Sequence, residues 1–387
     1  MKIVLAITSS IAAYKIPYLI RALKKEGHEL RAVLTENATH FVTEEVITLL
    51  SGEKPIVGNA YFHEKTSLHI ELSKWGDVLL VAPADYNIIG KVASGISDDI
   101  VSTTISSFRG PVLFAPSMHD VMWNNPILQD KVKYLRSKGY YFSGPDSGEL
   151  LSGDKGIGRL EEIEYIIDDV HAAYRGFPLE GRKILLVYGR TEEPLDDVRV
   201  LTNRSSGKMG LALAKEIKRN GGYLIQIVGK KEVEEYKRDE VIHVSTTEEM
   251  KNAICDKIED VDILIMAAAV SDFKPSKRER GKIRREEHAL LNVSLEKTED
   301  ILKTLKEFKK NKIFVGFALS DDIEHVAEKK LIEKHLDMIV ANRISSMESG
   351  KSTGFILTKG GKRLLFNDMP KERVATLILR EVLGFVT

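Results

Sequence analysis

Polar residues at 196–210 have the types and spacing of an anion-binding loop. The loop follows an apolar run at 184–188, which predicts a buried strand, and precedes a predicted helix at 211–220. Serine and glycine at 205–207 can turn the chain tightly, and backbone N–H groups at a helix N-terminus bind anions. A charged surface loop with a serine helix cap would use the same residues. The residue types alone leave both interpretations open.

The residue order of this loop is similar to that of a known family. Asp-Asp-Val-Arg at 196–199, followed by Asn-x-Ser-Ser-Gly-Lys-Met-Gly at 203–210, closely resembles one half of a bifunctional enzyme. It is the ligase half of the phosphopantothenoylcysteine decarboxylase/phosphopantothenate–cysteine ligases of coenzyme A biosynthesis. The resemblance implies that Asn203 is catalytic and holds an acyl intermediate. It also implies that Asn203, Ser206 and Lys208 bind substrate, whereas Arg159 is expected to bind substrate through the resemblance of the first half to a decarboxylase, described below.

Composition limits the classes of protein that need to be considered. The length of 387 residues favours two domains, and Lys plus Arg equal Asp plus Glu at 57 each, which argues against a general nucleic-acid binder. No apolar run reaches the roughly 18 to 20 residues of a membrane span, and the strand-like N-terminus does not look like a signal peptide. A single cysteine, Cys255, excludes a disulfide framework and is expected to be buried. We therefore expect a soluble cytoplasmic protein.

The first half alternates predicted strands and helices joined by short connections. The strands are expected at 2–8, 29–35, 77–82 and 111–115, and the helices at 11–25, 41–51 and 161–173. This alternation predicts an α/β fold with a doubly wound parallel sheet. Proline and glycine interrupt the pattern at 175–181, so we expect domains at 1–181 and 182–387.

Several polar residues of the first half follow predicted strands. The turn Thr8-Ser9-Ser10 could hold a phosphate or merely cap a helix. The turn is not a Gly-x-Gly-x-x-Gly fingerprint, so a nicotinamide cofactor is not indicated. His69 has a side chain that commonly carries protons, although a single histidine is more often structural.

These pieces together resemble the flavin-dependent cysteine decarboxylases, whose fold is flavodoxin-like. Pro83-Ala84-Asp85-Tyr86-Asn87 matches the Pro-Ala-x-x-Asn motif, residues 116–123 match the Pro-x-Met-Asn-x-x-Met-Trp motif, and residues 144–159 match the substrate flap. The resemblance implies that His69 is catalytic and that FMN is the cofactor. The residues expected to bind FMN are Thr8, Ser9, Ser10, Thr35, Pro83, Asn87 and Ser102.

Two departures from that family affect the expected chemistry. His119 replaces the motif asparagine, which in the family helps to hold the substrate carboxylate, and Ser152 replaces the flap cysteine, which gives a proton to the enethiol intermediate. A serine hydroxyl is a far weaker acid than a thiol, whose ordinary pKa is about 8.5. We expect both residues at the catalytic site, with His119 as the first candidate for the proton donor. Two alternatives stay open. The first half of the chain could release CO₂ and stop at the enethiol, or it could be inactive and only structural.

The second half repeats the α/β alternation, and its resemblance to the ligase implies a Rossmann-like domain. Strands are expected at 183–188, 223–228, 241–244, 261–266, 313–317 and 338–341, and helices at 211–220, 247–259 and 322–334. Small residues at 267–269 would let a ligand approach the backbone. The basic, irregular stretch 274–285 is either a solvated loop or a lid over a polyphosphate. Lys330 and Lys334 share a helix face, for which a plain surface is the simpler explanation.

The ligase resemblance implies that 4′-phosphopantothenate is activated by CTP, with Mg²⁺ held through the phosphates and no metal ligands assigned. The acyl-cytidylate formed then reacts with the amine of cysteine. The residues expected to bind CTP are Met266, Ala267, Ala268, Asp272, Lys282, Thr298, Glu299, Asp300, Ile301, Phe317, Lys330 and Lys334.

Relatives of the two halves form trimers and dimers, so a homo-oligomer without nucleic-acid or membrane partners is expected. Two other classes stay open. One is a monofunctional ligase with an inactive or altered flavoprotein domain, supported by Ser152 and His119. The other is a dinucleotide-dependent oxidoreductase, against which the missing glycine fingerprint counts.

Overall fold

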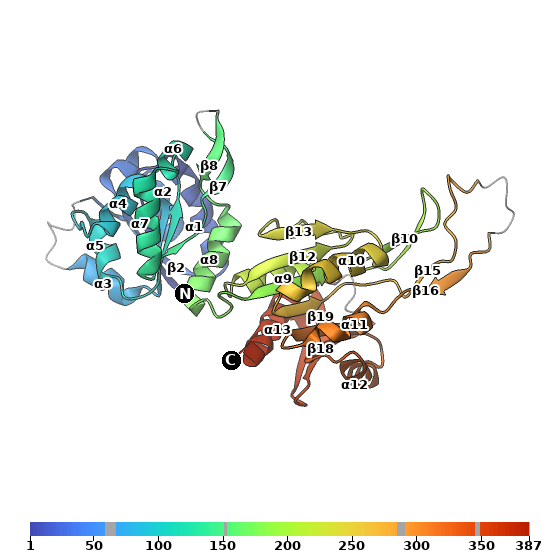
Figure 1. Cartoon of the computed structure of the whole chain (residues 1–387). Coiled ribbons are helices and arrows are strands. Elements are labelled where there is room, and N and C mark those ends of the chain that lie inside the picture. The colour runs from blue at the N-terminus through green and yellow to red at the C-terminus, as the bar shows by residue number, and fades with distance from the viewer. Residues whose placement is uncertain (59–66, 151–152, 285–290, 345–348, 387) are drawn as a thin grey trace. The chain divides into compact units, whose positions relative to one another are not determined.

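The computed structural model describes residues 1–58, 67–150, 153–284, 291–344 and 349–386. The chain forms two compact units, Met1–Phe177 and Pro178–Thr387, both shown in Figure 1. The division falls inside the stretch where proline and glycine interrupt the sequence pattern. Within the described ranges, no helix combines the length and the apolar composition needed to cross a membrane.

A six-stranded parallel sheet with the order β3-β2-β1-β4-β5-β6 forms the centre of the first unit. Its strands are β1 (Lys2–Ile7), β2 (Glu29–Leu34), β3 (Ile56–Val57), β4 (Val78–Ala84), β5 (Val112–Pro116) and β6 (Tyr141–Phe142). The α-helices are α1 (Ile16–Lys25), α2 (Glu44–Ser51), α3 (Leu68–Trp75), α4 (Tyr86–Ala93), α5 (Ile100–Ser107), α6 (Asp120–Trp123), α7 (Pro126–Ser137) and α8 (Ile163–Arg175). Two 3-10 helices, η1 (Ile11–Lys15) and η2 (Glu36–His40), follow β1 and β2.

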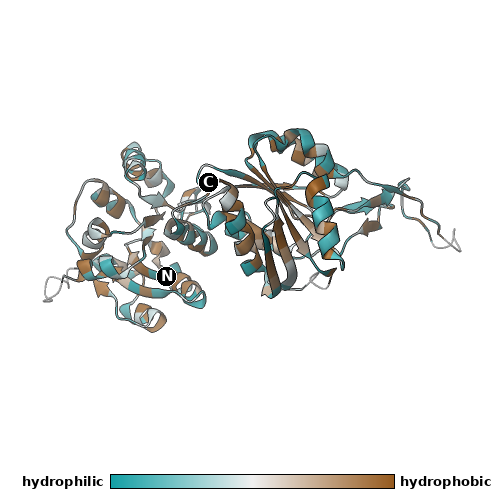
Figure 2. Ribbon diagram, turned by 90° about the horizontal axis from the view of Figure 1, so that it is seen from below, coloured by the Kyte–Doolittle hydropathy of each residue, from teal (hydrophilic) through white to brown (hydrophobic). Residues whose placement is uncertain are grey.

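Both faces of this sheet are buried, as a doubly wound fold requires. Along β1, Ile3, Leu5 and Ile7 pack into a core with α1, α2 and α8, whereas Val4 and Ala6 pack into a second core with α4, α5 and α7. Side chains alternate between the faces of a strand, so a continuous apolar run serves both cores. Figure 2 shows this apolar interior, with polar residues on the outer faces of the helices.

An antiparallel hairpin of β7 (Asp146–Glu149) and β8 (Lys155–Arg159) forms the described part of the expected flap. It packs against the segment that leaves β5, because the Met118 amide donates to the Gly158 carbonyl over 2.9 Å. A Cβ atom at Gly158 would clash with the carbonyl oxygen of Met118. Glycine therefore permits this close approach of two backbones.

The second unit contains an eight-stranded sheet with the order β13-β12-β9-β14-β17-β18-β19-β20. The strands are parallel from β13 to β18, and β19 and β20 extend the edge in antiparallel fashion. The strands of this sheet are β9 (Lys183–Tyr188), β12 (Tyr223–Val228), β13 (Glu240–His243), β14 (Ile263–Met266), β17 (Ile313–Leu319), β18 (Met338–Asn342), β19 (Lys351–Thr358) and β20 (Arg363–Pro370). The helices are α9 (Lys208–Lys218), α10 (Thr247–Lys257), η4 (Ile258–Asp260), α11 (Ile301–Thr304), η6 (Leu305–Lys309), α12 (Ile323–Glu333) and α13 (Lys371–Val386). The predicted parallel α/β class is confirmed for both units.

Two small hairpins correct the expectation of long irregular loops in this unit. β10 (Glu192–Pro194) pairs with β11 (Val200–Thr202), so part of the 196–210 stretch is a strand. β15 (Phe273–Pro275) pairs with β16 (Leu295–Lys297) at the start of the basic stretch. Figure 1 shows β10, β15 and β16 extending away from the main sheet. Cys255, expected to be buried, is half-buried.

Candidate functional site

The second unit brings two strand ends together where its strand order reverses. β9 and β14 are neighbours, and the residues that follow them continue to pair, because Arg190 forms a parallel bridge with Ala269. The side-chain amide of Asn203 donates to the Ala269 carbonyl over 3.0 Å, and the Ser271 amide donates to the Thr191 hydroxyl over 2.9 Å. Open α/β sheets bind ligands at such a reversal. The structure therefore joins the predicted Asn203 loop to the predicted small-residue segment.

A cavity of about 360 Å³ lies beside this reversal. The predicted CTP residues Thr298 and Asp272 meet directly, because the Thr298 amide donates to the Asp272 carbonyl over 3.0 Å. The Thr298 hydroxyl donates to the Ser271 carbonyl over 2.6 Å. Ten of the predicted CTP residues line the cavity: Met266, Ala268, Asp272, Thr298, Glu299, Asp300, Ile301, Phe317, Lys330 and Lys334.

Charged side chains of both signs line this cavity, namely Lys297, Lys330 and Lys334 against Asp272, Glu299 and Asp300. Lys334 pairs with Asp300 over 3.1 Å. Burial lowers the pKa of Lys330 and the neighbouring charge of Lys334 lowers it further, while Asp272 and Asp300 oppose this shift. The two lysines line a cavity, so the plain surface face expected from their spacing is wrong.

Two predicted CTP residues lie outside the lining of this cavity. The Ala267 amide is used in the sheet, where it donates to the Val187 carbonyl over 2.8 Å. Lys282 lies between Gly281 and Ile283, whose amides are bound by residues at the start of the 196–210 stretch. The Gly281 amide donates to Asp197 over 2.8 Å, and the Ile283 amide donates to Asp196 over 3.1 Å. The described structure therefore does not bring Lys282 to the cavity.

The carboxylate of Asp196, which accepts the hydrogen bond from the Ile283 amide, is fully buried. Burial disfavours its charge, but the amides of Val198, Ile283 and Arg199 and the Arg199 guanidinium donate hydrogen bonds to it. These bonds outweigh burial and lower the pKa of Asp196 to about 2. The carboxylate is therefore a fixed charge that ties the two segments together.

The predicted substrate residues of the second unit lie around the start of α9. Ser206 is buried, and its carbonyl accepts from the Glu232 amide over 3.1 Å. Lys208 is half-buried and begins α9, directly after Gly207 at a φ of 80°. Helix α9 therefore begins three residues before residue 211, where the sequence predicted its start.

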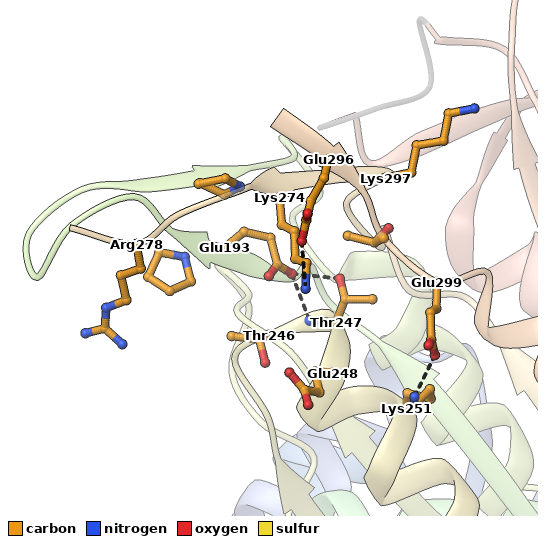
Figure 3. Close-up of a pocket in the computed structure, with 13 residues that line it drawn as sticks. Glu193, Thr246, Thr247, Glu248, Lys251, Lys274, Arg278, Glu296, Lys297 and Glu299 are labelled. Carbon is orange, nitrogen blue, oxygen red and sulfur yellow. Dashed lines mark hydrogen bonds and ion pairs between the residues drawn. The ribbon is translucent and has the colours of Figure 1, made fainter. Parts of the chain in front are cut away.

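A second cavity of about 610 Å³ adjoins the first and was not predicted. It shares Lys297, Thr298 and Glu299 with the first cavity, and β10, β15 and the start of α10 form its other walls. Figure 3 shows Glu193 accepting from the Thr247 amide and hydroxyl, at 2.8 and 2.7 Å. Ion pairs Lys274–Glu296 and Lys251–Glu299 cross the same region. Strands of three residues are too short to show an alternation of apolar and polar residues, so β10 and β15 gave no sequence signal for this second cavity. The signal that the sequence does contain is the Thr-x-x-Glu capping box at 246–249, which marks the start of α10.

The first unit has a cavity of about 670 Å³ between the carboxyl edge of its sheet and the flap hairpin. Three predicted residues are among those that line it: Ser10, His119 and Arg159. Apolar side chains of Ile11, Met118, Leu150 and Leu160 form much of the rest.

Most of the other predicted FMN residues lie at the reversal of this sheet, between β1 and β4. The Thr8 hydroxyl donates to the Pro83 carbonyl over 2.7 Å, and the hydroxyls of Ser9 and Thr35 are 3.2 Å apart. The Ser10 hydroxyl donates to that of Ser117 over 3.3 Å, which links this group to the cavity. Hydroxyl groups therefore gather where a doubly wound sheet binds its ligand.

Two predicted FMN residues stand apart from that group. Asn87 is exposed on the first turn of α4. Ser102 is fully buried, and its hydroxyl and amide form a capping box with Asp99 at the start of α5. Neither is among the residues that line the cavity.

His119 lies between two carboxylates at the mouth of the cavity. Its Nδ1 is 2.7 Å from Asp120 Oδ1, and its Nε2 is 3.7 Å from Asp154 Oδ2 on the flap. His119 is 38% exposed, so a substrate can reach it.

Of the other two catalytic candidates, His69 is not among the described residues that line this cavity. His69 is half-buried on α3, where its carbonyl accepts from the Ser107 hydroxyl over 3.4 Å. Ser152 lies outside the described residues.

Comparisons with known proteins cover nearly the whole chain. A family model described as "Flavoprotein" matches residues 1–175, and one described as "DNA/pantothenate metabolism flavoprotein C-terminal domain" matches residues 179–385. The "Coenzyme A biosynthesis bifunctional protein CoaBC" of Borreliella burgdorferi is 34% identical over 382 residues, which are 98% of each chain. The Bacillus subtilis protein of that name is 36% identical over 391 residues, 98% of this chain and 96% of the relative. A crystal structure of the C-terminal domain of such a protein is 32% identical and covers 54% of this chain and 97% of its own, with a TM-score of 0.47.

Proposed function

This chain belongs to the family of coenzyme A biosynthesis bifunctional proteins, and from this premise we propose a division of work between its two units. The second unit joins 4′-phosphopantothenate to cysteine at the expense of CTP. The first unit then decarboxylates 4′-phosphopantothenoylcysteine to 4′-phosphopantetheine with the help of FMN. The chain is thus a ligase and a lyase, and we place it in the cytoplasm.

The observation that carries the ligase assignment is the cavity of about 360 Å³ that ten predicted CTP residues line. The lining carries three lysines and three carboxylates, so it cannot by itself neutralise a triphosphate. Mg²⁺ binds through carboxylates and substrate phosphates, and Asp272 and Asp300 offer such oxygens. We therefore propose that CTP binds as its Mg²⁺ complex, with Phe317 against the base.

In the ligase reaction, the carboxylate of 4′-phosphopantothenate attacks the α-phosphate of CTP and releases pyrophosphate. Lys330 and Lys334 stabilise the charge on the phosphate oxygens by electrostatics. Asn203, held against Ala269, binds the acyl-cytidylate until the amine of cysteine attacks it. CMP then leaves and the amide forms.

The donor set of the first unit fits FMN. The hydroxyls of Ser9, Ser10 and Thr35 can donate to a phosphate, and the apolar wall of the cavity suits a flat ring. FMN would supply the two-electron redox chemistry that loss of CO₂ from the substrate requires. The protein holds the substrate in position and supplies the groups that donate and accept protons.

Proton transfer in the first unit is assigned to two histidines. His119, between Asp120 and Asp154, donates the proton that the family's flap cysteine would give. His69 lies on α3 outside the cavity of its own chain, so we propose that a second copy of the chain brings its His69 to the site. This makes a homo-oligomer necessary for decarboxylation.

Two assays test the proposal separately. Pyrophosphate release should require 4′-phosphopantothenate and CTP together, and amide formation should require cysteine as well. The purified chain should show a flavin absorbance spectrum and convert 4′-phosphopantothenoylcysteine to 4′-phosphopantetheine by mass spectrometry. A product that has lost only CO₂ and two hydrogens would mean that the proton donor is missing. An unchanged substrate together with absent flavin would overturn the decarboxylase assignment and leave a monofunctional ligase.

A further inference from the structure

Three side chains of the first unit, Glu26, His28 and His171, gather away from the cavity and have no part in the proposed reactions. Their donor atoms, one from each residue, all lie within 4.8 Å of one another. The Nε2 atom of His171 is 2.8 Å from Glu26 Oε2, and the Nε2 atom of His28 is 3.7 Å from the same oxygen. Two imidazole nitrogens and one carboxylate oxygen therefore lie close together.

The backbone holds two of these side chains in place. Glu26 is the C-cap residue directly after α1, and the amides of Gly27 and His28 donate to the carbonyls of Lys24 and Leu23 over 2.9 and 3.2 Å. Gly27 takes a φ of 84°, so this is a glycine-terminated helix end that turns the chain toward β2. Glu26 and His28 consequently project from a short, fixed segment.

The third side chain comes from the other end of the unit. His171 is 145 residues from Glu26 and lies on α8, which packs against α1. The side chain of His28 is 8% exposed, that of His171 is 12% exposed and that of Glu26 is 32% exposed. The two imidazoles are therefore shielded by protein, whereas the carboxylate borders on water.

We propose that Glu26, His28 and His171 form a binding site for Zn²⁺ or a similar divalent transition-metal ion. Two imidazoles with one carboxylate are a common ligand set for Zn²⁺, whereas Mg²⁺ and Ca²⁺ prefer oxygen ligands alone. Metal–ligand bonds of about 2.0–2.1 Å in a tetrahedron put ligand atoms roughly 3.3 Å apart. The observed separations of 2.8 and 3.7 Å bracket that value. Water on the side of Glu26 completes the coordination.

Such an ion would cross-link α8 to the segment that follows α1. α8 is the last helix of the first unit, and its apolar face belongs to the core that α1 shares. An ion bound by the folded state alone stabilises that state, and the stabilisation grows with the logarithm of the free-ion concentration once this exceeds the dissociation constant. The site therefore has a structural role and is independent of the CTP and FMN assignments.

The test uses the full-length chain without an affinity tag, because a polyhistidine tag binds metals and the N-terminal nitrogen is 3.5 Å from His28 Nδ1. After treatment with a chelator, the chain is titrated with Zn²⁺ by calorimetry and with Co²⁺ by visible absorbance. We expect one equivalent of each metal per chain, the intense Co²⁺ bands of a tetrahedral site, and a higher thermal unfolding midpoint with Zn²⁺. An absence of binding would overturn the proposal.

Variants locate the bound ion. Glu26→Gln and His171→Gln should each weaken Zn²⁺ binding by at least tenfold and abolish the Co²⁺ bands. The matched control is His243→Gln, which removes a histidine that is 2.9 Å from Glu235 but, within the described residues, belongs to no group of three donors. It should bind Zn²⁺ as the unaltered chain does. Equal binding by all three variants would place the ion elsewhere.

A second measurement does not depend on the folding of any variant. Crystals of the unaltered chain soaked in Zn²⁺ are measured at the zinc absorption edge. An anomalous peak between the imidazoles of His28 and His171 would confirm the site. A peak at other residues alone would refute it.

Discussion

The two units use the same sheet architecture but assemble their sites differently. In the second unit, the residues that follow β9 and β14 meet around Ala269, and ten predicted CTP residues line one cavity. In the first unit, the reversal between β1 and β4 gathers the predicted hydroxyls and His119 lines the cavity, yet His69 lies on α3 outside it. In our proposal, residues of one chain build the site of the second unit, whereas the site of the first unit takes its His69 from another copy. Strand ends thus locate a site more reliably than a helix does.

The largest expected effect concerns His119, the proposed proton donor of the first unit. Replacing His119 by Asn removes the acid and should slow formation of 4′-phosphopantetheine roughly 10²- to 10⁴-fold, the usual contribution of a general acid. The enethiol should accumulate, as measured by mass spectrometry. Adding Ser152→Cys to this variant restores the family's pair of residues and should rescue the product. Full activity of His119→Asn alone would remove His119 from the mechanism.

The next effect tests whether the second unit works through Asn203. Asn203→Ala loses the amide that holds the acyl-cytidylate and should slow amide formation roughly 10²- to 10³-fold, as loss of a transition-state donor does. Pyrophosphate release in a single turnover should persist, and acyl-cytidylate should accumulate. Decarboxylation by the same variant serves as the control and should not change. Unaltered amide formation would contradict the assigned role.

A smaller effect concerns the electrostatics of the CTP cavity. Lys330→Gln should raise KM for CTP roughly 10- to 100-fold, since a charged hydrogen bond contributes about 1.5–3 kcal/mol and about 1.4 kcal/mol is tenfold. The matched control is Lys329→Gln, because Lys329 is the preceding residue on α12 and its side chain is 63% exposed. It should leave KM unchanged. Similar values for both variants would argue against a specific role of Lys330.

The same lysine predicts a pH dependence. The pKa of Lys330 is lowered by burial and by Lys334, and only its protonated form attracts phosphate. The affinity for CTP should therefore fall as the pH rises through a value below the ordinary lysine pKa of about 10.4. KM for CTP measured as a function of pH should show this loss of affinity in the unaltered chain but not in Lys330→Gln. Identical profiles would contradict the assignment.

The smallest expected effect is local and involves the contact that holds the residues around Lys282. The pKa of Asp196 is about 2 in the folded chain and about 3.9 when exposed, so its stabilising effect is present above pH 3.9 and is lost as the pH falls toward 2. Asp196→Asn should accelerate hydrogen exchange of the Ile283 amide several-fold at neutral pH. Asp256→Asn, on an exposed position of α10, should not. Unaltered exchange in the first variant would show that other contacts hold this segment.

Apolar strands followed by small or polar residues made the main sheets and the strand-end loops predictable. Met266, Ala268 and Asp272 are examples, because the strand before them is buried and parallel strands share one edge. The hairpins β10–β11 and β15–β16 were not predicted, since their three-residue strands are too short to show alternation. The position of Lys282 depends on Asp196, a long-range contact that no local pattern encodes. Ser102 differs, because its hydroxyl belongs to a local helix cap with Asp99, three residues before it.

The most direct test of two cooperating sites on one chain is a single reaction of the purified protein with 4′-phosphopantothenate, cysteine, CTP and Mg²⁺. Mass spectrometry of the product distinguishes the outcomes. We predict 4′-phosphopantetheine, with 4′-phosphopantothenoylcysteine appearing first and then disappearing. Accumulation of 4′-phosphopantothenoylcysteine, or no reaction at all, would contradict the account.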